Sequence, residues 1–299
     1  MSGSGHNETR GILYAGGAYC IWGIVPLYWH YLEDVPPLEI TFHRIAWCAL
    51  TGLIVTLLRG RLLHFITVLR TSRLMMALAA SSLLISSNWT IYIYCVSAHR
   101  LIEASLGYYL TPLVSIALGV VLLGEKVSRV RLAAIALATA AVIVQAIALG
   151  SIPWIAPALA LTFGFYGYVR KLTPVDSLDG LTIETCLLVP VAVPLLAFWA
   201  VQGTAAFPSP ALGRDALLLG TGPLTAVPLV LFAAGARRIR MTTLGFLQYL
   251  SPTITLLVAT LVLGEPFTRT NVLSFACVWS ALVLVSLEGR IASWSGRTA

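Results

Sequence analysis

Charged residues are scarce in this 299-residue chain: they make up 10% of it, whereas soluble domains carry about 25%. Hydrophobic residues account for 58%, and the mean hydropathy is +0.89. A water-soluble fold could not hide that much apolar surface, so lipid must be the solvent for most of the chain. The composition therefore predicts an integral membrane protein with no length left for a soluble domain.

Motifs of direct ATP use, hydrolysis and metal binding are missing as well. The sequence has no GxxxxGK[ST] phosphate loop, no HExxH, no Cys/His cluster and no GxSxG nucleophile elbow. The five cysteines lie inside apolar runs without metal-ligand spacing, as small buried hydrophobes do. We therefore expect no enzyme activity, no metal and no cofactor.

The net charge of +7 would suggest a nucleic-acid partner in a soluble protein. Here the basic residues sit in short segments between apolar runs, which indicates membrane topology instead. We therefore expect no nucleic-acid partner.

Ten apolar runs are long enough to cross a bilayer, for which about 20 residues suffice. They lie at about 11–32, 38–58, 74–97, 102–123, 130–149, 152–169, 181–201, 213–235, 243–263 and 271–288. The predicted fold class is all-α integral membrane with ten transmembrane helices.

Lys and Arg are distributed unevenly between the two sides that these spans define. With the N-terminus inside, fifteen of the 19 fall in inside segments, Arg170 and Lys171 among them. Arg100, Arg214 and Arg269 fall outside, and Arg44 lies within a span. Such a positive-inside bias predicts that both termini are cytoplasmic.

A repeated pattern relates the two halves of the chain at an offset of 140 residues. Leu110-Thr111-Pro112, Leu123-Gly124-Glu125 and Arg129 correspond to Leu250-Ser251-Pro252, Leu263-Gly264-Glu265 and Arg269. We read residues 1–150 and 151–299 as two five-helix repeats. Five is odd, so the second repeat enters the membrane inverted, with Glu125 inside and Glu265 outside. Inverted repeats are typical of secondary transporters that bind substrate near the bilayer midplane.

Several motifs in a fixed order resemble a known family over nearly the whole chain. They are Tyr19-Cys20-Ile21-Trp22-Gly23-Ile24-Val25-Pro26, Glu39-Ile40-Thr41-Phe42-His43-Arg44, Ser87-Asn88-Trp89, Glu103-Ala104-Ser105-Leu106-Gly107-Tyr108-Tyr109, Phe165-Tyr166-Gly167 with Arg170-Lys171, Ile183-Glu184-Thr185, and Leu244-Gly245-Phe246-Leu247-Gln248-Tyr249. The halves resemble EamA domains of the drug/metabolite transporter superfamily, and the chain resembles its RarD family. The resemblance implies a multi-pass protein of the bacterial inner membrane, and related members export amino acids and similar metabolites.

Three polar residues stand out within or beside the predicted spans. Arg44 could bind a substrate carboxylate as a bidentate donor, or it could snorkel to the outer interface. His43 could bind substrate or titrate near neutral pH, or it could be hydrogen-bonded in the core. Glu184, at the start of the seventh span, could exchange protons during transport or simply cap its helix.

Other polar and aromatic residues complete the predicted substrate site, with ordinary packing as the alternative for each. Asn and Gln in a span must find hydrogen bonds, either between helices or along a substrate path. Aromatic walls suit a mostly apolar organic solute. The predicted substrate-binding residues are Trp22, His43, Arg44, Asn88, Trp89, Tyr108, Tyr109, Tyr166, Gln248 and Tyr249.

Two prolines at equivalent positions suggest a moving part. Pro112 and Pro252, near Gly107 and Gly245, could hinge an alternating-access motion or give the helices a static shape. The predicted function is a secondary active exporter of small organic solutes, with the lipid bilayer as environment and protons as coupling ion. The alternatives are a membrane-embedded enzyme and a non-transporting membrane protein, and the inverted repeat argues against both.

Overall fold

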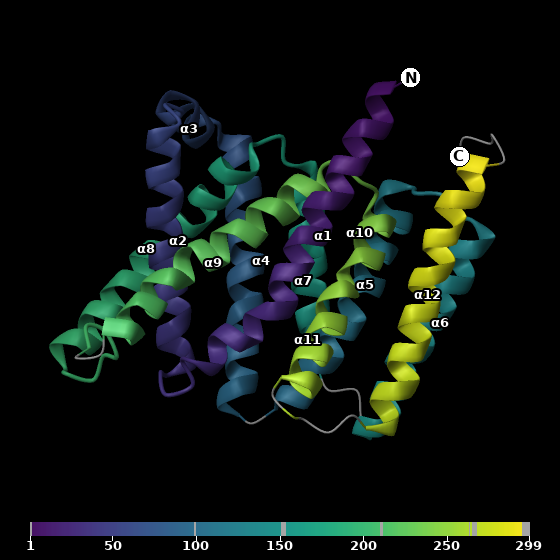
Figure 1. Cartoon of the computed structure of the whole chain (residues 1–299). Helices are drawn as coiled ribbons and strands as arrows, with labels where there is room; N and C mark the ends of the chain where they lie inside the picture. Colours follow the sequence, from purple (N-terminus) through teal and green to yellow (C-terminus); the bar gives the residue numbers. More distant parts are fainter. Residues whose placement is uncertain are drawn as a thin grey trace.

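The computed structural model describes residues 2–98, 100–150, 154–209, 212–262, 264 and 268–294. Glu265 lies outside these residues, so its predicted position is not described. The described chain folds into helices throughout (Figure 1). They are α1 (Ser2–His30), α2 (Pro37–Leu58), α3 (Leu62–Arg70), α4 (Ser72–Ser97), α5 (Leu101–Leu123), α6 (Arg129–Leu149), α7 (Ile155–Leu172), α8 (Ser177–Val201), α9 (Leu212–Ala236), α10 (Met241–Gln248), α11 (Leu250–Leu261) and α12 (Arg269–Trp294).

The predicted fold class, an all-α membrane protein, is confirmed. Among the described residues, nine helical segments are long and apolar enough to cross a bilayer, and Met241–Leu261 counts as one of them. The sixth predicted span is α7, which is shorter at 18 residues and ends with Arg170 and Lys171. Because α7 is covered by α4, α5 and α9, protein rather than lipid surrounds much of it, and it need not be as apolar as its neighbours.

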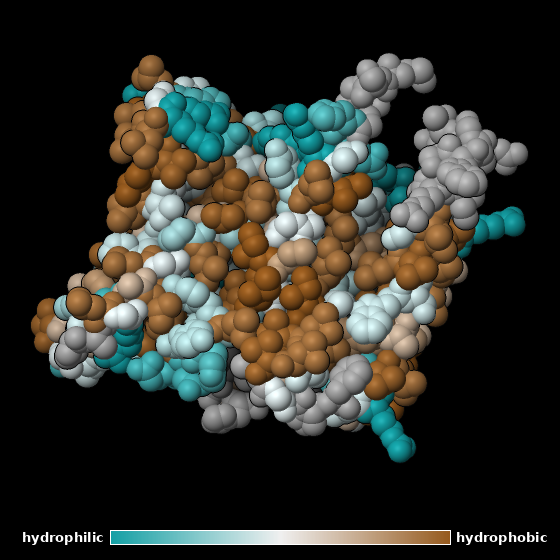
Figure 2. All heavy atoms as spheres, viewed as in Figure 1, coloured by the Kyte–Doolittle hydropathy of each residue, from teal (hydrophilic) through white to brown (hydrophobic). Residues whose placement is uncertain are grey.

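The surface has the polarity that a bilayer requires. Figure 2 shows hydrophobic residues over the middle of the visible face, with hydrophilic residues gathered towards its two ends. The start of α1, the end of α12 and helix α3 all lie at the same end of the bundle (Figure 1). We call this the termini end.

Segment 59–73, predicted as a plain connection, holds the amphipathic helix α3. Its buried Phe65 and Val68 pack against Leu78 and Ile183, while Leu63 is 81% exposed. A short helix with one apolar face on the protein and leucines facing outward fits the membrane interface. The distribution of Lys and Arg shows which side of the membrane segment 59–73 lies on, but it does not show whether the segment is a loop or an interfacial helix, because basic residues flank both.

The seventh span begins earlier than predicted, at Ser177 rather than 181. Asp176 is its N-cap and accepts a hydrogen bond from the Leu178 amide at 3.0 Å. Burial alone would raise the pKa of Asp176, but the Leu178 amide and the Arg61 guanidinium at 3.2 Å hold it below its usual value. The extra turn places Glu184 two turns inside the helix instead of at its start.

The ninth span is broken where its proline predicts. Pro252 has no amide hydrogen to donate to the Gln248 carbonyl, and α10 ends at Gln248 while α11 begins at Leu250. Around the corresponding Pro112, α5 stays continuous. The Thr111 hydroxyl donates to the Gly107 carbonyl at 2.8 Å there, whereas the carbonyl that Pro112 leaves without its helical donor is that of Tyr108.

The broken span packs against α5 in the opposite direction. Glu125, just past the end of α5, lies at the start of α10, and Gly245 faces Pro112 and Ile116 further along. The Tyr249 hydroxyl donates to the Tyr109 carbonyl at 3.3 Å, between residues 140 apart. The two segments that carry the sequence repeat therefore meet antiparallel along much of their length.

Glu125 joins the two halves of the chain at the termini end. Its carboxylate accepts hydrogen bonds from the amides of Met241 and Thr242 at 2.6 and 2.9 Å, so it caps α10. Arg240 adds an ion pair at 3.8 Å. Its partners lie more than 100 residues away in the sequence, so Glu125 fixes the start of α10 against the end of α5.

Replacing Glu125 by Ala is expected to lower the free energy of unfolding by about 1–3 kcal/mol, because two amides at the start of α10 lose a charged acceptor. Thermal unfolding of the purified protein in detergent measures this loss. Glu33→Ala is the matched control, because that carboxylate is 74% exposed and pairs only with His30. Equal stability of the two variants would contradict the capping role.

Candidate functional site

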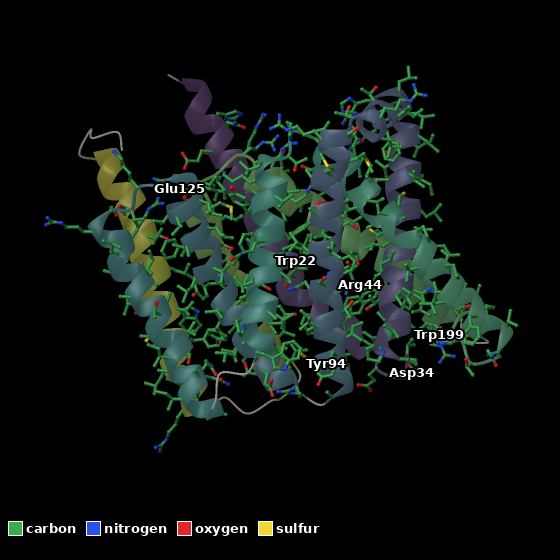
Figure 3. The ribbon with its side chains drawn as sticks, turned by 180° about the vertical axis from the view of Figure 1, so that it is seen from behind. Trp22, Asp34, Arg44, Tyr94, Glu125 and Trp199 are labelled. Atoms are coloured by element: carbon green, nitrogen blue, oxygen red, sulfur yellow. The ribbon has the colours of Figure 1, made fainter. Side chains whose placement is uncertain are left out.

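Arg44 lies inside the bundle, on α2 and near its mid-length (Figure 3). Its guanidinium stacks over the rings of Trp29 and Trp89, with centroid distances of 5.2 and 4.9 Å. Its Nε donates to the hydroxyl of Thr225 on α9 at 3.2 Å. Residues of α1, α2, α4 and α9 thus form a cradle around one cation, and these four residues are called the Arg44 cradle below.

The Arg44 cradle contains a cation without an acidic partner. No Asp or Glu within the described ranges forms an ion pair with Arg44, although ten other pairs occur. Tyr92, Cys48 and Tyr108 are the other polar groups that act on its charge. A charge at this depth is costly unless a partner compensates it, so the arrangement is suited to receive an anion from outside the protein. Arg44 is also partly accessible rather than fully buried.

Aromatic rings continue from the cradle into the middle of the bundle. Trp22 on α1 packs against Phe163 and Phe232, each with a centroid distance of 5.8 Å. Tyr166 stacks on Phe232 at 5.8 Å. Trp89 belongs to the same hydrophobic cluster, and these aromatic residues together are called the ring wall below. Such a wall suits the apolar body of an organic solute.

A second charged group is buried nearer the termini end, between α7 and α8. Arg170 and Glu184 are 0% and 1% exposed, and Nε of the arginine lies 3.5 Å from Oε1 of the glutamate. Ser81 of α4 donates to the same Oε1 at 2.5 Å, and Tyr166 donates to Oε2 at 3.4 Å. Gly180 provides the space, because a Cβ there would collide with the guanidinium.

Counting Arg170 among the loop cations is therefore wrong. α7 extends to Leu172, so Arg170 lies in its last turn and points into the protein. Its neighbour Lys171 instead donates to the carbonyls of Ala236 and Ile239 at the termini end. Adjacent residues on a helix point about 100° apart, so one basic pair supplies one buried and one peripheral cation.

His43 lies apart from the Arg44 cradle. Its Nδ1 accepts a hydrogen bond from the Trp47 indole at 3.1 Å, and its ring meets Phe207 edge-on at 5.4 Å. Nε2 faces Glu39 at 3.7 Å, and Glu39 accepts the Ala206 amide at 2.7 Å. These contacts hold α2 against the segment between α8 and α9. They favour the interpretation of His43 as a residue that is hydrogen-bonded in the core.

Of the remaining predicted site residues, most contact neighbouring helices, and one lies near Arg44. Asn88 donates to the Leu159 carbonyl and the Thr162 hydroxyl, both at 3.0 Å, and so links α4 to α7. Tyr109 and Tyr249 are buried together against α12. Gln248 is buried beside Tyr19. Tyr108 reaches towards Arg44 and Tyr92.

Three members of these two groups carry no recognisable signal in the sequence. Trp29 and Thr225 are ordinary residues of apolar runs, and Ser81 is one small hydroxyl among many. Their importance depends on which helices meet, and a single sequence does not report that. Tyr166 belongs to a family motif, and Glu184 stands out in the sequence as an acid at the start of a predicted span.

The fold and these buried charges define a class, namely a polytopic α-helical membrane protein with polar groups enclosed in its interior. The sequence model of the EamA-like transporter family matches residues 9–146 and 152–287. An uncharacterized transporter of Pseudomonas aeruginosa is 43% identical, covering 94% of this chain and 95% of that protein. YojE of Bacillus subtilis, also named as a transporter, is 42% identical over 95% and 96%. Protein RarD of Escherichia coli is 39% identical over 94% and 95%.

A crystal structure of another protein, 17% identical, has the same fold with a TM-score of 0.70 over 94% of this chain and 98% of that one. The chain belongs to the EamA-like transporter family, with RarD proteins among its relatives. It is thus a multi-pass membrane protein of a transporter family, as the motifs predict.

Proposed function

We propose that this protein is a secondary active transporter that exports small organic solutes bearing a carboxylate and an apolar body. The observation that carries the proposal is the Arg44 cradle, an enclosed cation with no acidic partner among the described residues. A guanidinium presents two parallel donors that match a carboxylate. The ring wall from Trp89 to Trp22 would contact the rest of the solute.

The cradle also connects the two halves of the chain. Trp29, Arg44 and Trp89 come from the first half, and Thr225 comes from the second. The antiparallel packing of α5 against the α10–α11 segment supports our reading of residues 1–150 and 151–299 as inverted repeats. A site between two such halves can face either side of the membrane in turn when the halves rock against each other.

We place the termini end in the cytoplasm of a bacterial cell, at the inner membrane, from the distribution of Lys and Arg. Export is the direction implied by the family. An enzyme would need acids, His or Cys converging at one depth. His43 and Arg44 point into different surroundings, so a membrane-embedded enzyme is the weaker reading. A non-transporting role would leave an enclosed, uncompensated cation without a purpose.

Flux in proteoliposomes tests the proposal. Four probes separate its parts: phenylalanine, leucine, phenylalaninol, which lacks the carboxylate, and chloramphenicol, which also lacks one. We expect exchange of phenylalanine that phenylalaninol does not inhibit. Absence of flux for every probe would reject the transporter, and equal handling of phenylalanine and phenylalaninol would reject carboxylate recognition.

Cysteine labelling tests the inverted arrangement independently of substrate. In a cysteine-free background, single cysteines replace Ser128, before α6, and Thr268, before α12. These are equivalent positions of the repeat. A membrane-impermeant thiol reagent should reach them from opposite sides of the membrane. Labelling of both from one side would contradict the inversion.

A further inference from the structure

We propose that Glu184 is the group that carries the coupling proton, with Arg170 as its fixed counter-charge and Ser81 as the hydroxyl that adapts to the proton. This inference rests on the proposed transport function and deepens it by naming the coupling ion. It is carried by the contacts of the buried group between α4, α7 and α8.

The Glu184 site has a hydrogen-bond arrangement for each protonation state. When the carboxylate is ionised, the Ser81 hydroxyl donates to Oε1 at 2.5 Å. When a proton is bound, the carboxylic acid can donate to the Ser81 oxygen, and the serine proton can turn to the Leu78 carbonyl at 3.0 Å. A hydroxyl both donates and accepts, so neither state leaves Ser81 or Oε1 unsatisfied. Binding forms one O–H bond on the carboxylate, and release breaks it.

Arg170 links the protonation of Glu184 to the structure around it. Nη2 donates to the Ser177 carbonyl at 3.3 Å, but Nε and Nη1 are buried without hydrogen-bond partners. The charge of Glu184 is thus the main compensation for a cation that cannot lose its proton. Neutralising Glu184 leaves Arg170 as an uncompensated buried charge. The protein must then admit water or rearrange around α7 and α8, which is the link between proton binding and movement that a coupled transporter needs.

The groups facing Glu184 come from both halves of the chain. From α7 they are Arg170 and Tyr166, from α2 Cys48, and from α4 the hydroxyls Ser81 and Ser82. Ser82 donates to the Glu184 carbonyl at 2.8 Å, so α4 holds both the side chain and the backbone of this residue.

The acid nearest to Glu184 on its own helix is engaged elsewhere. Asp179 faces Arg61 and His64, at 3.3 and 3.5 Å, towards the termini end. Among the described residues, Glu184 is therefore the acid that forms an ion pair with Arg170.

Helix α2 lies near both the Arg44 cradle and the Glu184 site. Cys48 lies one turn from Arg44 on α2 and interacts with both Arg44 and Glu184. Exchange of a proton for a substrate requires that the two oppose each other's binding. A rearrangement of α7 and α8 on protonation of Glu184 would therefore have to weaken substrate binding at Arg44, and by linkage bound substrate would favour proton release.

The first test measures flux of labelled phenylalanine in proteoliposomes, with and without a pH gradient. If one proton is exchanged per substrate, one unit of pH gradient supports about a tenfold substrate gradient. We expect Glu184→Gln to lose this accumulation while it retains phenylalanine exchange without a gradient. Glu103→Gln is the control, because that acid belongs to a partly exposed pair with Arg100 at 2.7 Å. Accumulation by Glu184→Gln equal to wild type would overturn the proposal.

The double variant Arg170→Gln with Glu184→Gln is the control for misfolding, because it leaves no unpaired buried charge. It should behave like Glu184→Gln if Glu184 is the proton site. The positioning role of Ser81 has its own readout. Ser81→Ala should move the pH of half-maximal flux upwards, because the ionised carboxylate loses more than the protonated one when a donor is removed. An unchanged pH profile would remove Ser81 from the site.

A second measurement does not need substrate. Infrared difference spectra of the purified protein between about pH 5 and pH 9 should show the band of a protonated carboxylic acid. The band should vanish in Glu184→Gln and persist in Glu103→Gln. Wild-type protein with this band but no flux of any probe would reject the transporter and keep the proton site. Wild-type flux together with a band that is unchanged in Glu184→Gln would keep the transporter and reject Glu184 as the proton site.

Discussion

Replacement of Arg44 by Ala is expected to lower phenylalanine flux at subsaturating concentrations by about 30-fold or more. Truncating one partner of a buried, hydrogen-bonded charge pair costs about 2–5 kcal/mol, and each 1.4 kcal/mol is a factor of ten. The substrate carboxylate would be left between Trp29, Trp89 and Thr225 with a single neutral hydroxyl to bind. Initial rates in proteoliposomes measure the effect.

Two further variants separate recognition from folding. Arg44→Lys keeps the charge but loses the planar pair of donors, so we expect a flux between those of wild type and Arg44→Ala. Arg100→Ala removes a peripheral arginine that pairs with Glu103, and its flux should stay near wild type. Membrane insertion of all three variants should be normal. Undiminished flux in Arg44→Ala would exclude Arg44 from the substrate site.

Replacement of Gly245 by Ala is expected to lower the free energy of unfolding by about 1–3 kcal/mol and to impair transport. A Cβ at this position would lie 2.7 Å from the Pro112 carbonyl oxygen and 2.6 Å from the Ile116 side chain. The oxygen belongs to a helix backbone and cannot turn aside. α10 would have to move away from α5, at the contact where the two repeated segments meet. Thermal unfolding in detergent and phenylalanine flux measure the two effects.

Gly213→Ala is the matched control for this prediction. That glycine is also helical, but a Cβ there meets no other atom within 4 Å, so we expect stability equal to or slightly above wild type. The pair also tests the hinge hypothesis. The other predicted hinge glycine, Gly107, is packed against α7, because a Cβ added there would lie 3.0 Å from Leu159. If Gly245→Ala keeps its stability but loses transport, backbone freedom rather than close packing is its role.

The hinge itself remains a prediction, and the structure narrows where it would act. The break between α10 and α11 falls at Tyr249, between Gly245 and Pro252. The corresponding stretch of α5, with Gly107 and Pro112, is continuous. A bending motion would therefore start in the broken segment, while α5 would serve as the surface against which it moves.

The positions of the spans could be predicted because hydropathy is a local property. Whether residues 213–235 prefer lipid depends on those residues alone, and the same holds for the other predicted runs. The proline break in the ninth span is local too, since Pro252 lacks its own amide hydrogen. α3 was missed because nine residues are too few to cross a membrane, and the start of α8 was misplaced because Asp176 was not recognised as its cap.

The site depended on tertiary structure. The sequence selected Arg44, Trp89 and Glu184 as site residues, placed Arg170 in an inside segment, and proposed both His43 and Arg44 for the substrate site. In the structure Arg170 pairs with Glu184, and His43 and Arg44 contact different neighbours. Gly180 gives the Arg170 guanidinium room beside α8, and the turn between residues 43 and 44 sends their side chains to different neighbours. A chain's own hydropathy decides that it enters the membrane, whereas contacts between residues far apart in sequence decide which buried charges are paired.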